Sequence, residues 1–190
     1  MWLLITGFVI SIAMTNTGMA RRVALHLMRL FGKKPGGAIL SPMIANLIVS
    51  PLTPSNTART AAMLPIVEGV AQAYRVEPGK SNFGKALFIA NTFASNITAG
   101  GFLTATIPNP VAIGMMVTAM GGAAVATSWG FWALAALPTT LVVLVGSQYV
   151  VRWIFPPEMK DIPGGLDYIE KELEAMGPTT TREKKAMLYF

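Results

Sequence analysis

Long apolar stretches alternate with short polar and basic segments along this chain. Residues 1–18 are apolar and just long enough to cross a bilayer, which takes about 20 residues. Residues 36–58 carry no charged side chain, and neither do residues 86–151. The second stretch is too long for one crossing and suits two crossings with a break between them. This pattern predicts an all-α integral membrane protein.

Residues 19–35 have the pattern of an amphipathic helix. Val23, Leu27, Leu30 and Phe31 fall on one face at helical spacing, while arginines and lysines occupy the rest. A basic helix of this kind is typical of the lipid headgroup region, so we expect it to lie at the membrane interface.

Residues 36–74 are apolar but interrupted in the middle by Pro51 and Pro54. Proline removes a backbone donor and blocks helix continuation, so the first arm should end there. Ser55 and Asn56 are suited to cap a second helix. Each arm is too short to span a bilayer, and the pair predicts a re-entrant helical hairpin whose tip lies in a protein-lined or water-filled cavity. The positive end of the second arm would point into that cavity and favour an anion.

Residues 83–127 predict a broken transmembrane helix. A first half-helix should end near Asn96, an unwound polar stretch should follow, and a second half-helix should begin after Pro108 and Pro110. Three further segments complete the predicted organisation: a transmembrane helix at 130–153, a cytoplasmic amphipathic segment at 155–186, and the start of a truncated span at 187–190.

Charge and composition narrow the possible functions. The 190 residues are 53% hydrophobic and 13% charged, with no cysteine and one histidine, so a thiolate or histidine-cluster metal site is excluded. The net charge of +6 lies in segments that flank apolar stretches, which indicates membrane topology and not nucleic-acid binding. The basic segments should all lie on the cytoplasmic side. Because that assignment is the same if both hairpin arms cross fully, two ordinary short spans remain an alternative.

Several motifs resemble one transporter family. Pro54-Ser-Asn-Thr-Ala-Arg59, followed by Met63-Leu-Pro-Ile66, resembles the hairpin of the divalent anion:sodium symporter family, in its citrate/succinate and 2-oxoglutarate/malate translocator branch. Phe102-Leu-Thr-Ala-Thr-Ile-Pro-Asn-Pro110 resembles the loop of the broken helix that follows. Phe155-Pro-Pro-Glu158 and Gly177-Pro-Thr-Thr180 resemble the segment that ends the family's first half.

The resemblance implies a fold and an assembly. Family members are homodimeric secondary transporters with two inverted repeats, each with one Ser-Asn-Thr hairpin and one broken helix. This chain resembles the later part of the first repeat only, from the fourth span to a point before the seventh. It would therefore be a fragment that supplies half of the site.

The resemblance also implies site residues. Ser55, Asn56 and Thr57 would contact a substrate carboxylate, with Thr104 nearby, and Ser55 and Asn56 would form a sodium site with backbone carbonyls of Gly100 and Gly101. Hydroxyl and amide groups can serve both a carboxylate and a hard cation. The alternative is that Ser55 or Asn56 simply caps the second arm. Sodium binding has less support than anion binding, because the family's symporters commonly have a serine at the position of Pro51.

Arg59 is a charge in the first turn of the second arm, where a cation opposes the helix dipole. An anion would relieve that conflict. We hypothesise that Arg59 adds positive charge near the dicarboxylate and partly replaces a coupling cation. The alternative is an arginine that pairs with a lipid phosphate or a backbone carbonyl.

Three functions follow from these features. The first is secondary active transport of di- or tricarboxylates, of the citrate, succinate, malate or 2-oxoglutarate class. It would operate in the plasma (inner) membrane by exchange or sodium-coupled alternating access. The second is a non-transporting truncated subunit or assembly partner. The third, a membrane enzyme, lacks paired acids, a nucleophile–base set and metal ligands inside the spans, so we expect no enzyme and no cofactor beyond a coupling sodium ion.

Overall fold

The computed structural model describes residues 5, 9, 16–73, 76–120, 128–159, 165–181 and 183–184, and these residues contain helices and loops without a strand. Most of the predicted first span, the end of the hairpin at Tyr74, residues 121–127 and the predicted start at 187–190 lie outside the described residues. The elements are α2 (Met19–Phe31), α3 (Pro35–Val49), η1 (Ser50–Leu52), α4 (Asn56–Ala73), α5 (Asn82–Gly101), η2 (Leu103–Ala105), α6 (Pro108–Ala119), α7 (Trp129–Ile154) and α8 (Gly165–Met176).

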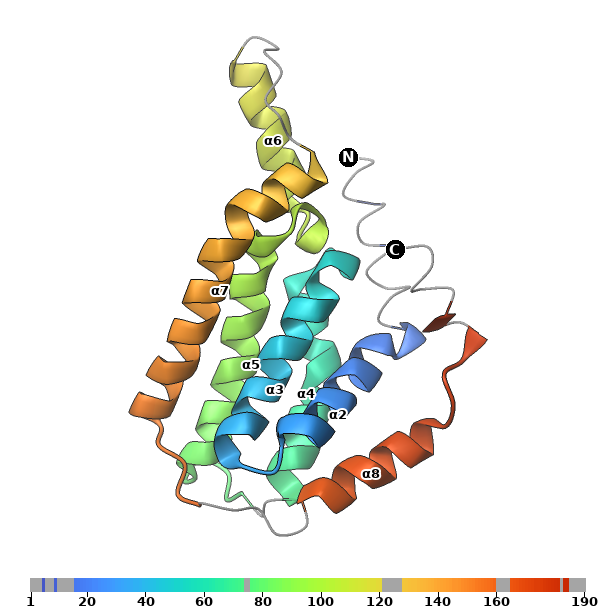
Figure 1. Ribbon diagram of the computed structural model, residues 1–190, viewed down its shortest axis with the longest axis vertical. Helices are drawn as coiled ribbons and strands as arrows, with labels where there is room; N and C mark the ends of the chain where they lie inside the picture. Colours follow the sequence, from blue (N-terminus) through green and yellow to red (C-terminus); the bar gives the residue numbers. More distant parts are fainter. Residues whose placement is uncertain are drawn as a thin grey trace.

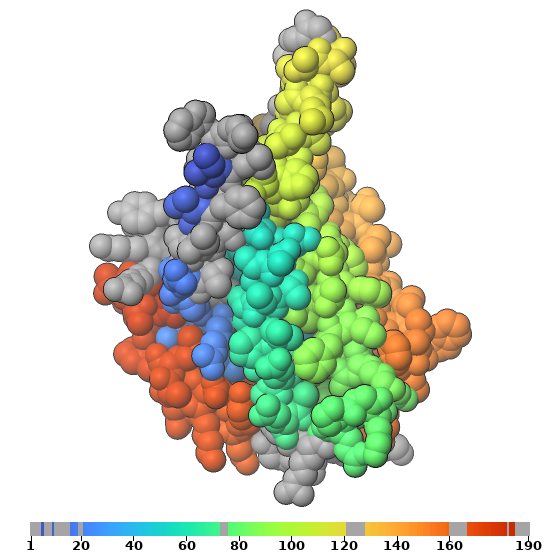
Figure 2. Space-filling model, turned by 180° about the vertical axis from the view of Figure 1, so that it is seen from behind, coloured from blue at the N-terminus to red at the C-terminus, as the bar shows by residue number. Residues whose placement is uncertain are grey.

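Helix α5 is the centre of the bundle. It packs against both arms of the hairpin, α3 and α4, and against α7 (Figure 1). Helices α3 and α5 run upward in this view, whereas α4 and α7 run downward. Helix α2 lies on α3, and α8 crosses the lower end against α2 and α4. The face of α4 remote from α3 is visible in Figure 2 between α5 and the pair formed by α2 and α8.

The sequence of α5 explains this central position. Its N-terminus is capped by Ser81, whose side chain accepts a hydrogen bond from the Gly84 backbone N–H. Apolar and small side chains then recur every three or four residues on one broad face, which is buried. The buried residues include Phe83, Leu87, Ala90, Asn91, Ala94, Ser95 and Thr98.

The first half-helix is longer than predicted, because α5 ends at Gly101 and not near Asn96. Polar side chains in this region bond back to the helix. Asn96 Nδ2 donates to the Thr92 carbonyl at 2.9 Å, and Thr98 Oγ1 donates to the Ala94 carbonyl at 2.7 Å. These groups are satisfied inside the helix and do not end it.

The packing of α2 also differs from its predicted pattern. Leu25 and Met28 are buried against the bundle, whereas Leu30 and Phe31 are exposed. The buried face is set by α3 and α8, which flank the helix. Arg21 and Arg29 pair with Glu172 and Glu170 of α8. The partners seen here are carboxylates of the same chain, and the interfacial location of α2 stays a prediction.

Among the described residues, two segments are long and apolar enough to cross a membrane: Pro35–Leu52, which comprises α3 and η1, and Trp129–Ile154, which is α7. One face of α7 exposes large apolar side chains, among them Leu134, Val142 and Val145. Such a face suits contact with lipid tails. The re-entrant path of the α3–α4 hairpin stays a prediction. Helix α6 extends away from the bundle, beyond the top of α7 (Figures 1 and 2).

Candidate functional site

The tip of the hairpin and the break between α5 and α6 lie side by side at one end of the bundle (Figure 1). The short turns η1 and η2 contact each other there. Thr104 Oγ1 donates a hydrogen bond of 2.7 Å to the carbonyl of Pro51, which is 53 positions away in the sequence. The fold thus brings together two polar interruptions that the sequence separates.

The Ser-Asn-Thr motif forms the start of α4. Ser55 Oγ accepts a hydrogen bond of 3.2 Å from the Ala58 backbone N–H, so Ser55 caps the helix. Asn56 Nδ2 donates to Asn96 Oδ1 of α5 at 2.9 Å, and Thr57 is exposed. The capping role weighed as an alternative for Ser55 is therefore present. It uses one of the two acceptor lone pairs of the hydroxyl, and a contact with substrate stays a prediction.

Arg59 is completely buried at this end of the bundle. Its Nη1 donates to the carbonyls of Thr53 and Ala105 at 2.6 and 2.7 Å, and its Nη2 donates to the carbonyl of Ser95 at 3.1 Å. These three carbonyls belong to the hairpin tip, η2 and α5. Arg59 therefore joins the two interruptions, and it pairs with backbone carbonyls inside the protein and not at its surface.

The charge of Arg59 has no acidic partner among the described residues. A buried cation without a counter-charge is costly, and its three carbonyl partners carry only partial charges. The positive end of α4 lies at the same place, because Arg59 is in the first turn of that helix. Two sources of positive potential thus coincide at the tip. The side chain has no exposed surface in this conformation, so an anion would feel its field and would not touch it.

The loop after α5 is ordered by polar and aromatic contacts. Asn109 Nδ2 donates to the carbonyls of Ala99 and Phe102 at 2.8 and 2.9 Å, and so satisfies the C-terminal end of α5. Trp129 stacks on Phe102 with ring centroids 5.7 Å apart, and its Nε1 donates to Thr104 Oγ1 at 3.1 Å. Asn109 therefore shapes the loop.

Gly100 and Gly101 do not form an unwound stretch, because they are the last residues of α5. The small size of Gly101 serves packing against α7. A Cβ atom on Gly101 would lie 3.1 Å from Thr140, and Trp132 Nε1 donates to the carbonyl of Gly100 at 3.0 Å. That carbonyl keeps one lone pair for a cation. A sodium ion here would also share this end of the bundle with the buried Arg59, which disfavours it.

Two buried asparagines were not singled out from the sequence. Asn46 on α3 and Asn91 on α5 are almost fully buried, and Asn46 Nδ2 donates to Asn91 Oδ1 at 3.0 Å. Asn91 Nδ2 then donates to the carbonyl of Thr60 on α4 at 3.3 Å. The amides connect both hairpin arms to α5. The sequence feature that could have identified them is an amide side chain within each apolar segment, since an amide needs a hydrogen-bond partner when it is buried.

The motif that ends at Glu158 lies at the opposite end of α5, where Glu158 contacts the N-terminus of this helix. The carboxylate accepts hydrogen bonds from the backbone N–H groups of Asn82 and Phe83, the latter at 3.1 Å, and from Ser81 Oγ at 3.3 Å. Burial raises the pKa of Glu158, but these hydrogen bonds lower it more, so the net pKa lies below the ordinary value. A carboxylate at this place stabilises the N-terminus of α5.

The segment that begins with the motif at Gly177 contains a second carboxylate with buried partners, that of Glu183. Glu183 Oε1 accepts from Arg22 Nε at 2.8 Å, and both side chains are buried. Glu183 Oε2 accepts from the Thr180 backbone N–H at 2.6 Å, while Thr180 Oγ1 accepts from the Glu183 N–H at 3.2 Å, which is a capping box. Burial raises the pKa of Glu183, and the bonds from Arg22 and Thr180 lower it to a net value below the ordinary one.

Comparison with known proteins identifies the family of this chain. The family model described as the sodium:sulfate symporter transmembrane region matches residues 1–190. The chain belongs to this family. It is therefore membrane-embedded, and its family, the divalent anion:sodium symporters, consists of transporters and not enzymes.

Individual relatives point the same way. Proteins named L-tartrate/succinate antiporter, from Escherichia coli strains UTI89 and K12 and from Shigella flexneri, are each 32% identical to this chain over 98% of its length. The match covers 38% of each relative. This chain therefore spans less than half the length of the relatives that it matches.

Proposed function

We propose that this chain supplies half of the anion site of a secondary transporter that exchanges dicarboxylates across the plasma (inner) membrane. One observation carries the proposal: the Ser-Asn-Thr tip and the η2 turn are joined around a buried arginine that has no carboxylate partner among the described residues. Positive potential at a polar helix terminus inside a membrane protein suits a small anion. The relatives' name favours substrates of the tartrate and succinate type over citrate.

The tip offers specific groups to a carboxylate. Thr57 is exposed at the start of α4, and the amide of Asn56 lies beside it in the same turn. Thr104 is exposed on the neighbouring η2 turn. We assign Asn56 and Thr57 to direct contact, Ser55 to capping with a second contact to the carboxylate, and Arg59 to an electrostatic contribution from behind them. Thr104 would contact the carboxylate only if its hydroxyl gives up its bond to the Pro51 carbonyl, so we assign it to holding η2 against the hairpin tip. The second carboxylate would be bound by the other half of the carrier.

Movement of the site requires that the hairpin and the broken helix stay together. Arg59 joins the hairpin tip to Ser95 and Ala105, and Asn91 joins Asn46 to the backbone of α4. These buried polar bonds connect α3, α4, α5 and η2. We infer that they move as one body during alternating access.

Exchange is the coupling that this site favours. A permanent cation at the tip already balances part of the substrate charge, so the empty site is left with excess positive potential. An empty carrier of this kind should return across the membrane only with a counter-anion bound. Sodium coupling would place a second cation close to the first, although the oxygens of Ser55, Asn56 and Gly100 could otherwise serve as ligands.

The test uses the full-length protein that carries this chain, reconstituted in liposomes. Uptake of labelled succinate should require succinate or tartrate inside the vesicles and should be unchanged when sodium is replaced by potassium. Thr57→Ala should raise the succinate KM by about tenfold, the loss of one good hydrogen bond to a charged group. The matched control is Thr118→Ala on α6, whose hydroxyl bonds only to the carbonyl of Gly114. Sodium-dependent uptake into vesicles without internal anion would refute exchange.

A homodimer is also proposed, from the resemblance to the family. The alternative of a non-transporting subunit remains testable in the same membranes. The intact mass of the native product should be well above the 20.2 kDa of this chain if the remaining part of the carrier is on the same polypeptide. A product of 20.2 kDa that binds no dicarboxylate would instead favour the non-transporting subunit.

A further inference from the structure

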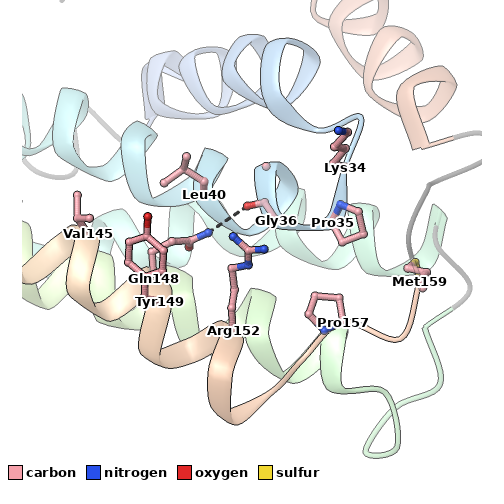
Figure 3. A pocket seen from close by; sticks show the side chains of 11 residues that line it. Lys34, Pro35, Gly36, Leu40, Val145, Gln148, Tyr149, Arg152, Pro157 and Met159 are labelled. Atoms are coloured by element: carbon pink, nitrogen blue, oxygen red, sulfur yellow. Dashed lines mark hydrogen bonds between the residues drawn. The ribbon is translucent and has the colours of Figure 1, made fainter.

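A second polar site lies at the other end of the bundle, between the start of α3 and the end of α7 (Figure 3). It is a half-open cavity of about 590 Å³. It lies at the start of α3, at the opposite end of that helix from the Ser-Asn-Thr tip, and shares no residue with the tip. The lining residues that carry the argument are Lys34, Gly36, Leu40, Val145, Gln148 and Arg152.

The polar part of the cavity is positive. Lys34 and Arg152 line it from opposite sides, and the described residues place no carboxylate within 4.0 Å of either side chain. Lys34 is also the N-cap of α3, so the first backbone N–H groups of that helix open near the cavity. Two cations and a helix N-terminus at one place favour a phosphate or another anion.

Gln148 gives independent evidence on the chemistry of the ligand that this cavity would bind. Its side chain is 7% exposed and points to the first turn of α3, where Nε2 donates to the Gly36 carbonyl at 3.1 Å (Figure 3). Its Oε1 is buried and has no donor among the described residues. A buried acceptor of this kind needs a hydrogen-bond donor. The ligand that completes this cavity therefore carries a hydroxyl or amine group as well as an anionic group.

The position of the cavity shows where such a ligand would come from. One candidate span begins at Pro35 and the other ends at Ile154, so the cavity lies where both leave the apolar layer. Leu40 and Val145 form its wall on the membrane side, and Trp153 beside it is 83% exposed. An exposed tryptophan at this level is typical of the headgroup boundary. Basic pockets at the cytoplasmic ends of spans bind anionic lipid headgroups.

We propose that this cavity binds the headgroup of an anionic glycerophospholipid with free hydroxyls, of the phosphatidylglycerol type. The phosphate lies between Lys34 and Arg152. Gln148 Oε1 has no accessible surface in the present conformation, so the amide turns toward the cavity when a glycerol hydroxyl donates to it. One acyl chain follows Leu40 and Val145 along the outer face of α7. The lipid would tie the end of α7 to the base of the hairpin. The proposal requires only that the chain is membrane-embedded and does not depend on which anion is carried.

The experiment is native mass spectrometry of the full-length protein in detergent, titrated with lipids. Phosphatidylglycerol should bind with a Kd about tenfold lower than phosphatidylcholine, and Arg152→Gln should remove most of that preference. The matched control is Lys80→Gln, which removes one exposed cation from a loop at the same end of the bundle and should leave the Kd within about twofold. If Arg152→Gln does not fold, Lys34→Gln provides the same test.

Two further arms decide the chemistry and the source. Gln148→Leu should weaken phosphatidylglycerol but not phosphatidylmethanol, which is anionic and has no hydroxyl to donate. Glycerol phosphate without acyl chains should fail to displace the lipid at millimolar concentration. The proposal is overturned if phosphatidylglycerol and phosphatidylcholine bind alike, if Lys80→Gln matches Arg152→Gln, if Gln148→Leu affects both anionic lipids equally, or if glycerol phosphate displaces the lipid.

Discussion

Replacement of Arg59 is the most informative perturbation of the hairpin tip. Arg59→Gln removes the charge and shortens the side chain, so that it can reach at most one of the three carbonyls that Arg59 now bonds. Arg59→Lys keeps the charge but loses the planar fork that serves several carbonyls at once. The two variants therefore separate the role of the charge from the role of the hydrogen bonds that join the hairpin tip to η2 and α5.

The size of the effect follows from the contacts. Hydrogen bonds to charged groups contribute about 1.5–3 kcal/mol each. The lower figure applies here, because the guanidinium is desolvated and its Nε has no partner in the described part of the chain. Loss of two bonds in Arg59→Gln therefore lowers the free energy of unfolding by about 3 kcal/mol. The loss is concentrated where the tip meets η2, so the proposed substrate-binding side chains of Asn56 and Thr57 lose their fixed positions as well.

The assay combines thermal stability and affinity in the full-length protein. Arg59→Gln should lower the melting temperature clearly and raise the succinate Kd by about tenfold or more, equivalent to about 1.4 kcal/mol. Arg59→Lys should be intermediate in stability and closer to wild type in affinity, because it keeps the positive field. Arg29→Gln is the matched control, since Arg29 is exposed and its ion pair is long at 3.8 Å.

Two results would refute this reasoning. If Arg59→Gln leaves stability, affinity and counter-anion dependence unchanged, the side chain neither holds the tip nor acts on the substrate. If Arg59→Lys loses affinity as fully as Arg59→Gln while both remain folded, the charge alone contributes nothing, and Arg59 acts only by holding the two loops together.

Three further predictions concern contacts outside the hairpin tip. The carboxylates of Glu158 and Glu183 have pKa values below the ordinary one, so they stabilise the fold above the ordinary carboxylate pKa and lose this effect as the pH falls through the lowered values. Melting curves from pH 7 to pH 3 should show this loss of stability. The double Gln variant should show a weaker dependence of the melting temperature on pH. Glu183→Gln alone leaves the buried arginine of α2 without its counter-charge and should cost about 3 kcal/mol at pH 7, measured by chemical denaturation. Gly69→Ala places a Cβ atom against the phenol group of Tyr168, so this ring must move, which should loosen α8 and increase its cleavage by protease. Gly146→Ala, whose added Cβ meets nothing within 4 Å, should leave cleavage unchanged, and equal cleavage of the two variants would show that this contact does not hold α8.

Much of the element order could be predicted from the sequence. Prolines ended the first arm near Pro51, and Ser55 marked the start of the second arm, because both effects act on the local backbone. The predicted end of α5, near Asn96, is wrong for an equally local reason. An unwound polar stretch is predicted after Asn96, yet Asn96 bonds back to its own helix and the helix continues to Gly101.

The sequence by itself determined the class of the protein, its apolar segments and the family it resembles. These depend on composition and short spacing, which need no knowledge of distant contacts. Only the tertiary structure decided the partners of the charged groups. Arg59 turned inward to carbonyls from three segments, and Arg22 found a buried carboxylate 161 positions away. A buried charge takes whatever partner the packing brings within reach, and packing depends on which helices meet and not on their order in the chain.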